Sequence, residues 1–476
     1  MEVAPAHSCF VDAANITLVL VIVTALAFDF TNGFHDTANA MAASISTGAL
    51  KPRVAVGLSA ILNLVGAFLS VQVALTVTNA VINLQTKDGA PNPELLADGG
   101  EAVLLIILAG LAGGILWNLF TWLLGLPSSS SHALLGGLTG AGAAGLGWAG
   151  VKWNGDGTKL DGVVGKILLP SMISPIIAIV VAFTGCWLVH KVTESVMHRL
   201  EERYFRYGQV GSASLVSIAH GTNDAQKTMG VMTLALIASG HWTSTTSIPV
   251  WVKFSAAAAI AAGTYLGGWR IIRTLGKGLV DITPRQGMSS DGSTAAVLLS
   301  ASHLGFALST THVATGSVLG GGLGRGTPVR WSTAGRMVTA WATTFPIAAL
   351  MGALMWWIGD SVGGAVGASV VFLILAGFST WIFRSSRRDH VGADNVNDEW
   401  ERAAEITSPA YEHAPVTHAH QNGSDPTQNG SGPTQNGSGP TQNGSGPTQN
   451  GSRPAGPEDA DPADRDQVEP TDTKTH

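Results

Sequence analysis

Two carboxylates occupy equivalent positions in a short motif that occurs twice in the chain. Gly33-Phe34-His35-Asp36 recurs 188 residues later as Gly221-Thr222-Asn223-Asp224, and each copy lies within a long apolar stretch. A carboxylate inside a bilayer is costly, so it is usually functional and has a partner. Hard cations bind carboxylate, amide and carbonyl oxygens, and the paired motifs therefore predict cation sites. The candidate cation-binding residues are Asp36, Asp224, Asn32, Asn39 and Asn223.

A second pair of motifs is rich in hydroxyl groups. Ser129-Ser130-Ser131-His132 recurs 180 residues later as Ser309-Thr310-Thr311-His312, and an apolar run follows each copy. Serine is a favoured N-cap residue, and a helix N-terminus with unpaired N–H groups suits an oxyanion. An alternative is that small residues let helices pack closely, which explains the nearby glycines better than these runs. The candidate oxyanion-binding residues are Ser129, Ser130, Ser131, Ser309, Thr310 and Thr311.

Other polar residues in the same stretches have less certain roles. Lys227 could add one positive charge to the oxyanion site, although the first motif has no counterpart to it. His132 and His312 either cap and pack their helices or carry protons near neutral pH. Asp29 either lines the same cavity or neutralises Lys227, and we interpret His220 as structural.

The two predicted sites imply a mechanism if they share one cavity. An anion cannot lie near two carboxylates at low dielectric unless protons or cations neutralise them. Cation occupancy would then be a precondition for anion binding. Such coupling is symport, and Asp36 and Asp224 would be its coupling-ion residues.

The elements that position these residues are predicted from composition and hydropathy. Only 12% of the 476 residues are charged, which is too few for the surface of an ordinary soluble enzyme. Long apolar stretches predict membrane-spanning helices, because a helix satisfies its own backbone hydrogen bonds in hydrocarbon. We expect an all-α polytopic membrane protein with about 10–12 membrane segments. The stretches lie near residues 15–50, 53–82, 101–125, 126–150, 166–190, 210–240, 249–269, 288–308, 309–324, 329–358 and 365–384.

Three of these stretches are expected to be irregular. The stretch 15–50 is too long for one crossing and contains polar residues, so we expect a broken helix there. The Gly-rich stretches 126–150 and 309–324 are short, and we expect them to form re-entrant hairpins.

The distribution of Lys and Arg predicts the orientation. Counting each stretch as one crossing, an outside N-terminus and a cytoplasmic tail put fifteen basic residues inside and five outside. The first half then crosses the membrane an odd number of times, so the second motif pair enters it upside down. Inverted repeats with interrupted helices are typical of secondary transporters that work by alternating access.

These observations divide the chain into five parts. Residues 1–190 form the first membrane repeat, 191–209 a basic cytoplasmic connecting loop, and 210–360 the second, inverted repeat. Residues 361–384 form an extra C-terminal membrane helix, and 385–476 a low-complexity tail that we expect to be disordered. No basic stripe suggests nucleic-acid binding, and we expect no cofactor.

At these motifs the sequence resembles the inorganic phosphate transporter (Pit) family, specifically its bacterial low-affinity members. The similarity covers the segments 27–40 and 219–227 and the two hydroxyl-rich runs, within about residues 15–360. It implies low-affinity phosphate uptake across the cell membrane, driven by a proton or sodium gradient. The residues named above as cation-binding and oxyanion-binding would serve the coupling ion and phosphate, with Lys227 beside the phosphate. The resemblance also allows a divalent metal such as magnesium to travel as a neutral phosphate complex, and the protein could be a homodimer.

Two alternatives are kept beside this interpretation. A sulfate permease of the same architecture would also bind a divalent tetrahedral anion, but sulfate cannot donate hydrogen bonds as phosphate can. An intramembrane serine hydrolase would use Ser131, His132 and Asp36. It is disfavoured because adjacent residues of a helix point about 100° apart and no nucleophile-elbow motif surrounds the serines.

Overall fold

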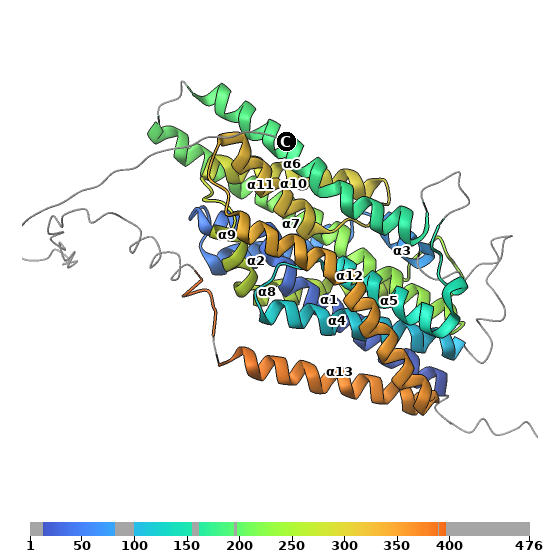
Figure 1. The fold of residues 1–476 in the computed structure, drawn as a ribbon. Helices are drawn as coiled ribbons and strands as arrows, with labels where there is room; N and C mark the ends of the chain where they lie inside the picture. Colours follow the sequence, from blue (N-terminus) through green and yellow to red (C-terminus); the bar gives the residue numbers. More distant parts are fainter. Residues whose placement is uncertain (1–12, 81–99, 155–160, 195–197, 389, 397–476) are drawn as a thin grey trace, which may run out of the picture. The chain divides into compact units, whose positions relative to one another are not determined.

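The computed structural model describes residues 13–80, 100–154, 161–194, 198–388 and 390–396, all within the compact unit Met1–Pro409. Among these residues the regular elements are helices, with one isolated β-bridge between Val280 and Val329 (Figure 1). The expected all-α class is therefore confirmed. The tail lies outside the described residues from 397 onward.

The helices follow one another with short connections. Their bounds are α1 Ala13–Ser46, α2 Pro52–Gly66, α3 Gln72–Ala80, α4 Glu101–Leu123, α5 Ser130–Leu146, α6 Leu169–Thr193, α7 His198–Ala238, α8 Val250–Leu266, α9 Trp269–Lys277, α10 Pro284–His303, α11 Thr310–Arg325, α12 Trp331–Val362 and α13 Gly364–Ser386. A 3₁₀ turn, Trp148–Gly150, and a π-helical turn, Val164–Leu168, lie between α5 and α6.

The order α1–α6 is matched by the order α7–α12. The long motif helix α1 packs against α8, and the second motif helix α7 packs against α2. In the same way α5 packs against α12, and α11 packs against α6. Each half therefore covers the other through corresponding helices. That the two halves are inverted relative to each other stays a prediction.

Glycines at the two motif offsets allow these close approaches. A Cβ at Gly33 would collide with the backbone of α8, and one at Gly221 with the backbone of α2. A Cβ at Gly136 in α5 would lie 2.6 Å from the Phe345 carbonyl oxygen of α12. The corresponding Cβ at Gly316 in α11 would lie 2.7 Å from the Pro175 carbonyl oxygen of α6.

Length and apolar composition qualify five helices to cross a membrane, or six if the bent pair α8 and α9 counts as one span. The single crossings are α1, α4, α6 with its preceding turn, α12 and α13. Helices α5 and α11 have 17 and 16 residues and reach only about 26 and 24 Å, which is too short for the hydrocarbon core. Re-entrant hairpins would have this length, and the total of membrane segments stays a prediction.

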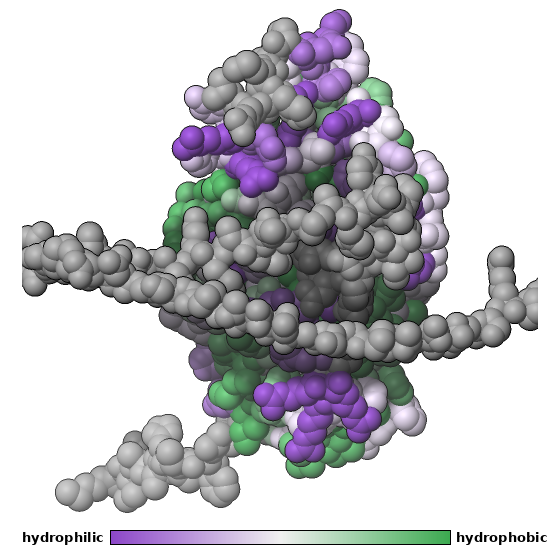
Figure 2. Space-filling model, turned by 90° about the vertical axis from the view of Figure 1, so that its left-hand side faces the viewer, coloured by the Kyte–Doolittle hydropathy of each residue, from purple (hydrophilic) through white to green (hydrophobic). Residues whose placement is uncertain are grey.

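The apolar surface fits a lipid environment. Helix α4 is enclosed, with Leu104, Ile107 and Leu108 fully buried, whereas α6 exposes Met172 and Val180. Figure 2 shows hydrophilic residues gathered at the upper end of that view, with hydrophobic residues along the sides below them.

Two expectations are wrong in detail. Helix α1 is continuous through Asp29, Asn32 and Asp36, because these side chains have partners on other helices and the backbone ladder needs no interruption. The connector expected over 191–209 is largely helical: α6 extends to Thr193, and α7 begins at His198. An i,i+4 pair in which Arg206 donates to Glu202 at 2.8 Å supports this first part of α7.

Candidate functional site

The two motif aspartates meet in one buried site. Asp36 on α1 and Asp224 on α7 are 1% and 0% exposed. The Thr310 hydroxyl at the start of α11 lies 2.9 Å from Oδ2 of Asp36 and 3.3 Å from Oδ2 of Asp224. One hydroxyl therefore reaches both carboxylates, and residues from three distant segments converge as the motif pairs predicted.

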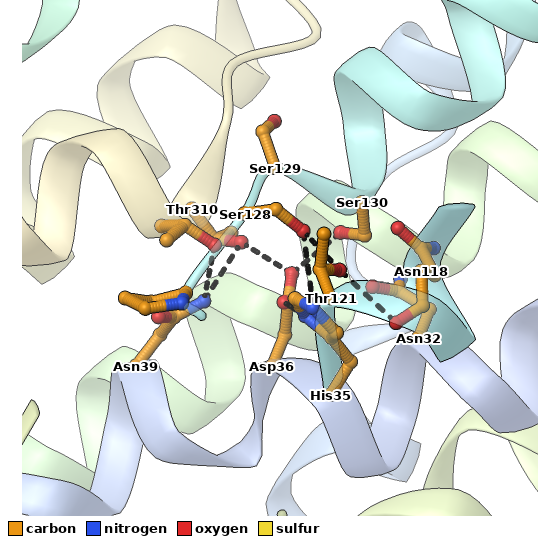
Figure 3. A network of polar contacts seen from close by, with 12 residues as sticks. Asn32, His35, Asp36, Asn39, Asn118, Thr121, Ser128, Ser129, Ser130 and Thr310 are labelled. Atoms are coloured by element: carbon orange, nitrogen blue, oxygen red, sulfur yellow. Dashed lines mark hydrogen bonds and ion pairs between the residues drawn. The ribbon is translucent and has the colours of Figure 1, made fainter. Parts of the chain in front are cut away.

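Asp36 is surrounded by donors from the first hydroxyl-rich run and from its own helix. The Ser130 hydroxyl donates to Oδ2 at 2.6 Å, and His35 Nδ1 lies 2.7 Å from Oδ1. His35 Nε2 is in turn 3.3 Å from the Ser128 hydroxyl, which lies 2.7 Å from that of Thr121. Figure 3 shows the Asp36 carboxylate pointing into this network.

Asp224 has a stronger positive partner. Lys227 Nζ lies 2.5 Å from its Oδ1, and Asn223 donates to the same oxygen at 2.7 Å. His220 Nε2 and Asn32 Nδ2 lie 3.3 and 3.4 Å from Oδ2. The two halves thus exchange histidine and asparagine: at the 188-residue offset His35 corresponds to Asn223, and Asn32 to His220.

The residue three positions after each aspartate contacts the hydroxyl run of the opposite half. Lys227 is 1% exposed and donates to the Ser131 hydroxyl at 2.5 Å and to the Leu308 carbonyl at 2.9 Å. Asn39, at the equivalent position, donates to the Thr311 hydroxyl at 3.0 Å. These crossed contacts connect each motif helix to the tip of the other half.

The starts of α5 and α11 form two adjoining tips. Ser129 and Ser309 are N-caps, and their side chains accept from the amides of His132 and His312, each at 3.2 Å. Figure 3 shows Ser129 pointing away from Asp36. The two imidazole rings lie 4.7 Å apart, and Trp341 packs 4.3 Å from that of His312.

Each tip also offers backbone donors. The first four amides of a helix have no intrahelical acceptor, and they lie at the positive end of the helix dipole. In α5 and α11 these amides belong to the residues whose hydroxyls meet the carboxylates and Lys227, so hydroxyl and amide donors gather at one place.

The amide side chains leave oxygens available for a cation. Among the described residues, the Oδ1 atoms of Asn32, Asn39 and Asn223 are buried without a hydrogen-bond partner. Single ligand atoms of Asp36, His220 and Asp224 all lie within 4.8 Å of one another. Carboxylate and amide oxygens are the donor set that hard cations prefer, so these residues fit a cation that moves with the substrate.

Comparison with known proteins places the chain. The sequence pattern described as the phosphate transporter family matches residues 32–352. The chain belongs to this family. A probable low-affinity inorganic phosphate transporter of Mycobacterium tuberculosis is 54% identical over 386 residues, which are 81% of this chain and 87% of that protein. One from Bacillus subtilis is 42% identical over 348 residues, which are 73% of this chain and 98% of that protein.

A solved structure supports the fold. A protein described as a sodium-dependent phosphate transporter is similar with a TM-score of 0.60 and 21% identity, over 72% of this chain and 98% of that one. The chain is therefore a multi-pass membrane protein and a transporter, not an enzyme. The hydrolase alternative is excluded, and the Ser131 hydroxyl in fact lies against Lys227.

Sequence reasoning missed part of the transporter's site. His220 was expected to be structural, yet it lies 3.3 Å from Asp224, and i,i+4 spacing on one helix face could have indicated this contact. His35 and Ser128 were not among the predicted site residues. Pairing of Asp29 with Lys227 is wrong: Lys227 pairs with Asp224, while Asp29 Oδ1 accepts from Thr228 at 2.6 Å.

Proposed function

We propose that this protein takes up inorganic phosphate by cation symport through alternating access. The observation that carries the proposal is the convergence of two buried carboxylates and two hydroxyl-rich helix tips at one place. The names of the relatives support phosphate as the substrate. The charges and hydrogen bonds of the site support the coupling.

The charge balance of the site requires a cation when phosphate enters. Lys227 offsets Asp224, which leaves the Asp36 carboxylate beside neutral donors and His35. Two like unit charges 4 Å apart repel by about 4 kcal/mol at an effective dielectric of 20. A proton or a sodium ion at the Asp36 side removes this repulsion, so it binds before or with the anion.

Hydrogen bonding couples the two ligands in a second way. The Ser130 and Thr310 hydroxyls donate to Asp36 in this structure, and bonds to an ionised acceptor are about twice as strong as neutral ones. Neutralising Asp36 weakens its hold on both hydroxyls, which can then donate to phosphate. Cation binding thus prepares the anion site with the same donors.

The remaining predicted residues have distinct parts in this scheme. Ser131 and Thr311, with Lys227, hold phosphate from the two tips, and the caps Ser129 and Ser309 fix the tips in place. We retain Asn32, Asn39 and Asn223 as ligands of the coupling ion, and their unpaired oxygens support this role. His132 and His312 meet where the tips touch and are proposed to carry protons there.

The choice of ion and anion is open to direct test. The solved relative is described as sodium-dependent, whereas two histidines beside the aspartates favour protons. Carboxylate acceptors favour phosphate over sulfate, because only protonated phosphate can donate to them. A neutral magnesium phosphate complex would also avoid the charge repulsion.

The test is uptake of radioactive phosphate into proteoliposomes under separately imposed proton and sodium gradients, with and without magnesium and with sulfate as competitor. We expect one gradient to drive concentrative uptake, and Asp36→Asn to abolish it. Asp360→Asn, an exposed aspartate near the end of α12, is the control and should accumulate phosphate normally. Uptake that ignores both gradients would indicate a passive channel and overturn the proposal.

A further inference from the structure

A deep crevice separates the last helix from the rest of the transporter. It has a volume of about 670 Å³ and lies between α13, α1, α4 and the bend between α8 and α9. In Figure 1, α13 runs along the lower edge beneath α4 and α1. This helix lies outside residues 32–352 that match the family, so the crevice is made partly by an addition to the shared fold.

The walls of the crevice are apolar along most of its length. Residues of α1, α4 and α13 face one another across it, and the lining includes Val23, Ala27, Phe30, Phe34, Ile115, Leu119, Phe372, Leu375, Ala376 and Ile382. Apolar cavities in proteins do not hold water well, because water needs polar partners. In a bilayer the available apolar filler is a lipid acyl chain.

One end of the crevice is basic. Arg270, Arg387 and His390 line it there, beside Trp122 and Trp269. This end lies where the apolar helix α13 finishes, so hydropathy places it at the membrane–water interface. Figure 2 looks onto that end of the molecule and shows hydrophilic residues gathered at its lowest part, the level of α13 in Figure 1.

The basic end is rigid and retains unused donors. Arg270 donates to the carbonyls of Leu123 at 3.2 Å and Ser386 at 3.1 Å, which ties α9 to the ends of α4 and α13. The exposed Arg387 guanidinium lies over the Phe383 ring at 5.4 Å. Within the described part of the chain, the buried Trp122 Nε1 has no hydrogen-bond partner although its residue lines the crevice.

We propose that this crevice binds one anionic phospholipid, with an acyl chain between α13 and α1 and the phosphate at Arg387, His390 and Trp122. Arginine suits phosphate oxygens through paired hydrogen bonds, and basic pockets between membrane helices bind anionic headgroups. The combination of a long apolar wall and a basic, donor-bearing end matches the two chemistries of such a lipid. This role goes beyond the proposed transport function and does not depend on it.

A second crevice in the same protein provides a comparison. It has a volume of about 480 Å³ and lies between α6 and α10, with an apolar lining that includes the neutral hydroxyls of Ser174 and Ser300. Because its lining contains no charged residue, any lipid there should bind without regard to headgroup charge. Selectivity for an anionic headgroup therefore reports on the α13 crevice and not on this one.

The test is native mass spectrometry of the full-length protein titrated with phosphatidylglycerol or phosphatidylcholine of the same acyl composition. We expect the wild type to retain one phosphatidylglycerol more tightly than phosphatidylcholine. Arg387→Gln should weaken that binding about fivefold, the effect of one basic residue near a membrane surface, and leave phosphatidylcholine unchanged. Arg388→Gln removes the same charge from a neighbouring exposed position that does not line the crevice, and it should bind like the wild type.

A second variant tests the acyl chain. Ala376→Phe fills the apolar part of the crevice and should reduce retention of phosphatidylglycerol while Arg387 is intact. Equal binding by Arg387→Gln and Arg388→Gln overturns the proposal. So does equally strong competition by soluble glycerol phosphate, because the site would then bind phosphate groups without needing the lipid tail.

Discussion

At the scale of single residues, the site is a set of buried polar groups that depend on one another. Asp224 and Lys227 are both fully enclosed and pair at 2.5 Å, and Asp36 depends on donors from two other elements. Burying such groups is costly unless each has its partner. Substitutions here should therefore separate stability from transport in recognisable ways.

The Asp224–Lys227 pair can be tested by a double-mutant cycle. Removing one partner of a buried pair leaves an uncompensated charge and costs about 3–5 kcal/mol. Lys227→Met alone and Asp224→Asn alone should each lower the thermal stability of the purified protein. The double variant should recover part of the loss, although it should not transport phosphate. Additive losses in the double variant would mean that the two groups do not interact.

Neighbouring serines of the first tip should behave differently. Ser130 donates to Asp36, whereas the Ser129 side chain caps α5. Ser130→Ala should raise the KM for phosphate about tenfold, the loss of one hydrogen bond to a charged group, with little change in stability. Ser129→Ala should instead lower stability by about 1 kcal/mol with a smaller change in KM. Uptake kinetics and thermal melting measure both, and identical effects of the two variants would contradict these roles.

At the scale of elements, the site exists because corresponding helices of the two halves approach closely. Glycines at Gly136 and Gly316 let α5 and α11 lie on the backbones of α12 and α6. The tips that hold the hydroxyl runs are therefore positioned by backbone packing. Long motif helices then present Asp36 and Asp224 from opposite halves of the sequence.

A methyl group at these contacts should displace a tip. Gly316→Ala should destabilise the protein by about 1–3 kcal/mol, the usual cost of overpacking, and slow phosphate uptake. Gly335→Ala on α12 is the control, because a Cβ there meets nothing within 4 Å and alanine favours helix. Thermal melting should distinguish them, and equal stability of both variants would show that the contact of α11 with α6 tolerates a side chain.

How much of this was predictable from sequence follows from what is local. The offsets of Asp36 to Asp224 and of Ser130 to Thr310 predicted the convergence, because repeats carry their own geometry. The continuity of α1 was not predictable, because it depends on partners from other segments. The exchanged roles of His35 and His220 were missed for the same reason, since only the fold reveals which aspartate each histidine reaches.

At the scale of the whole molecule, orientation in the membrane is the main prediction beyond the fold. The basic residues favour a cytoplasmic end of α13 at Arg387 and Arg388 and an outer end near Ser361. Cysteines at Arg388 and Ser361, both exposed, should react with membrane-impermeant maleimide from opposite sides. Only Ser361→Cys should be labelled in intact cells. Labelling of Arg388→Cys from outside would reverse the predicted topology.

The most direct test of the account is equilibrium binding of phosphate to the purified protein as a function of proton and sodium concentration. Because binding linkage is reciprocal, neutralisation of Asp36 by a cation predicts that phosphate affinity rises with the concentration of the coupling ion. The same rise should disappear in Asp36→Asn and persist in Asp360→Asn. A phosphate affinity that is independent of both ions in the wild type, or a dependence that survives in Asp36→Asn, would contradict the central claim.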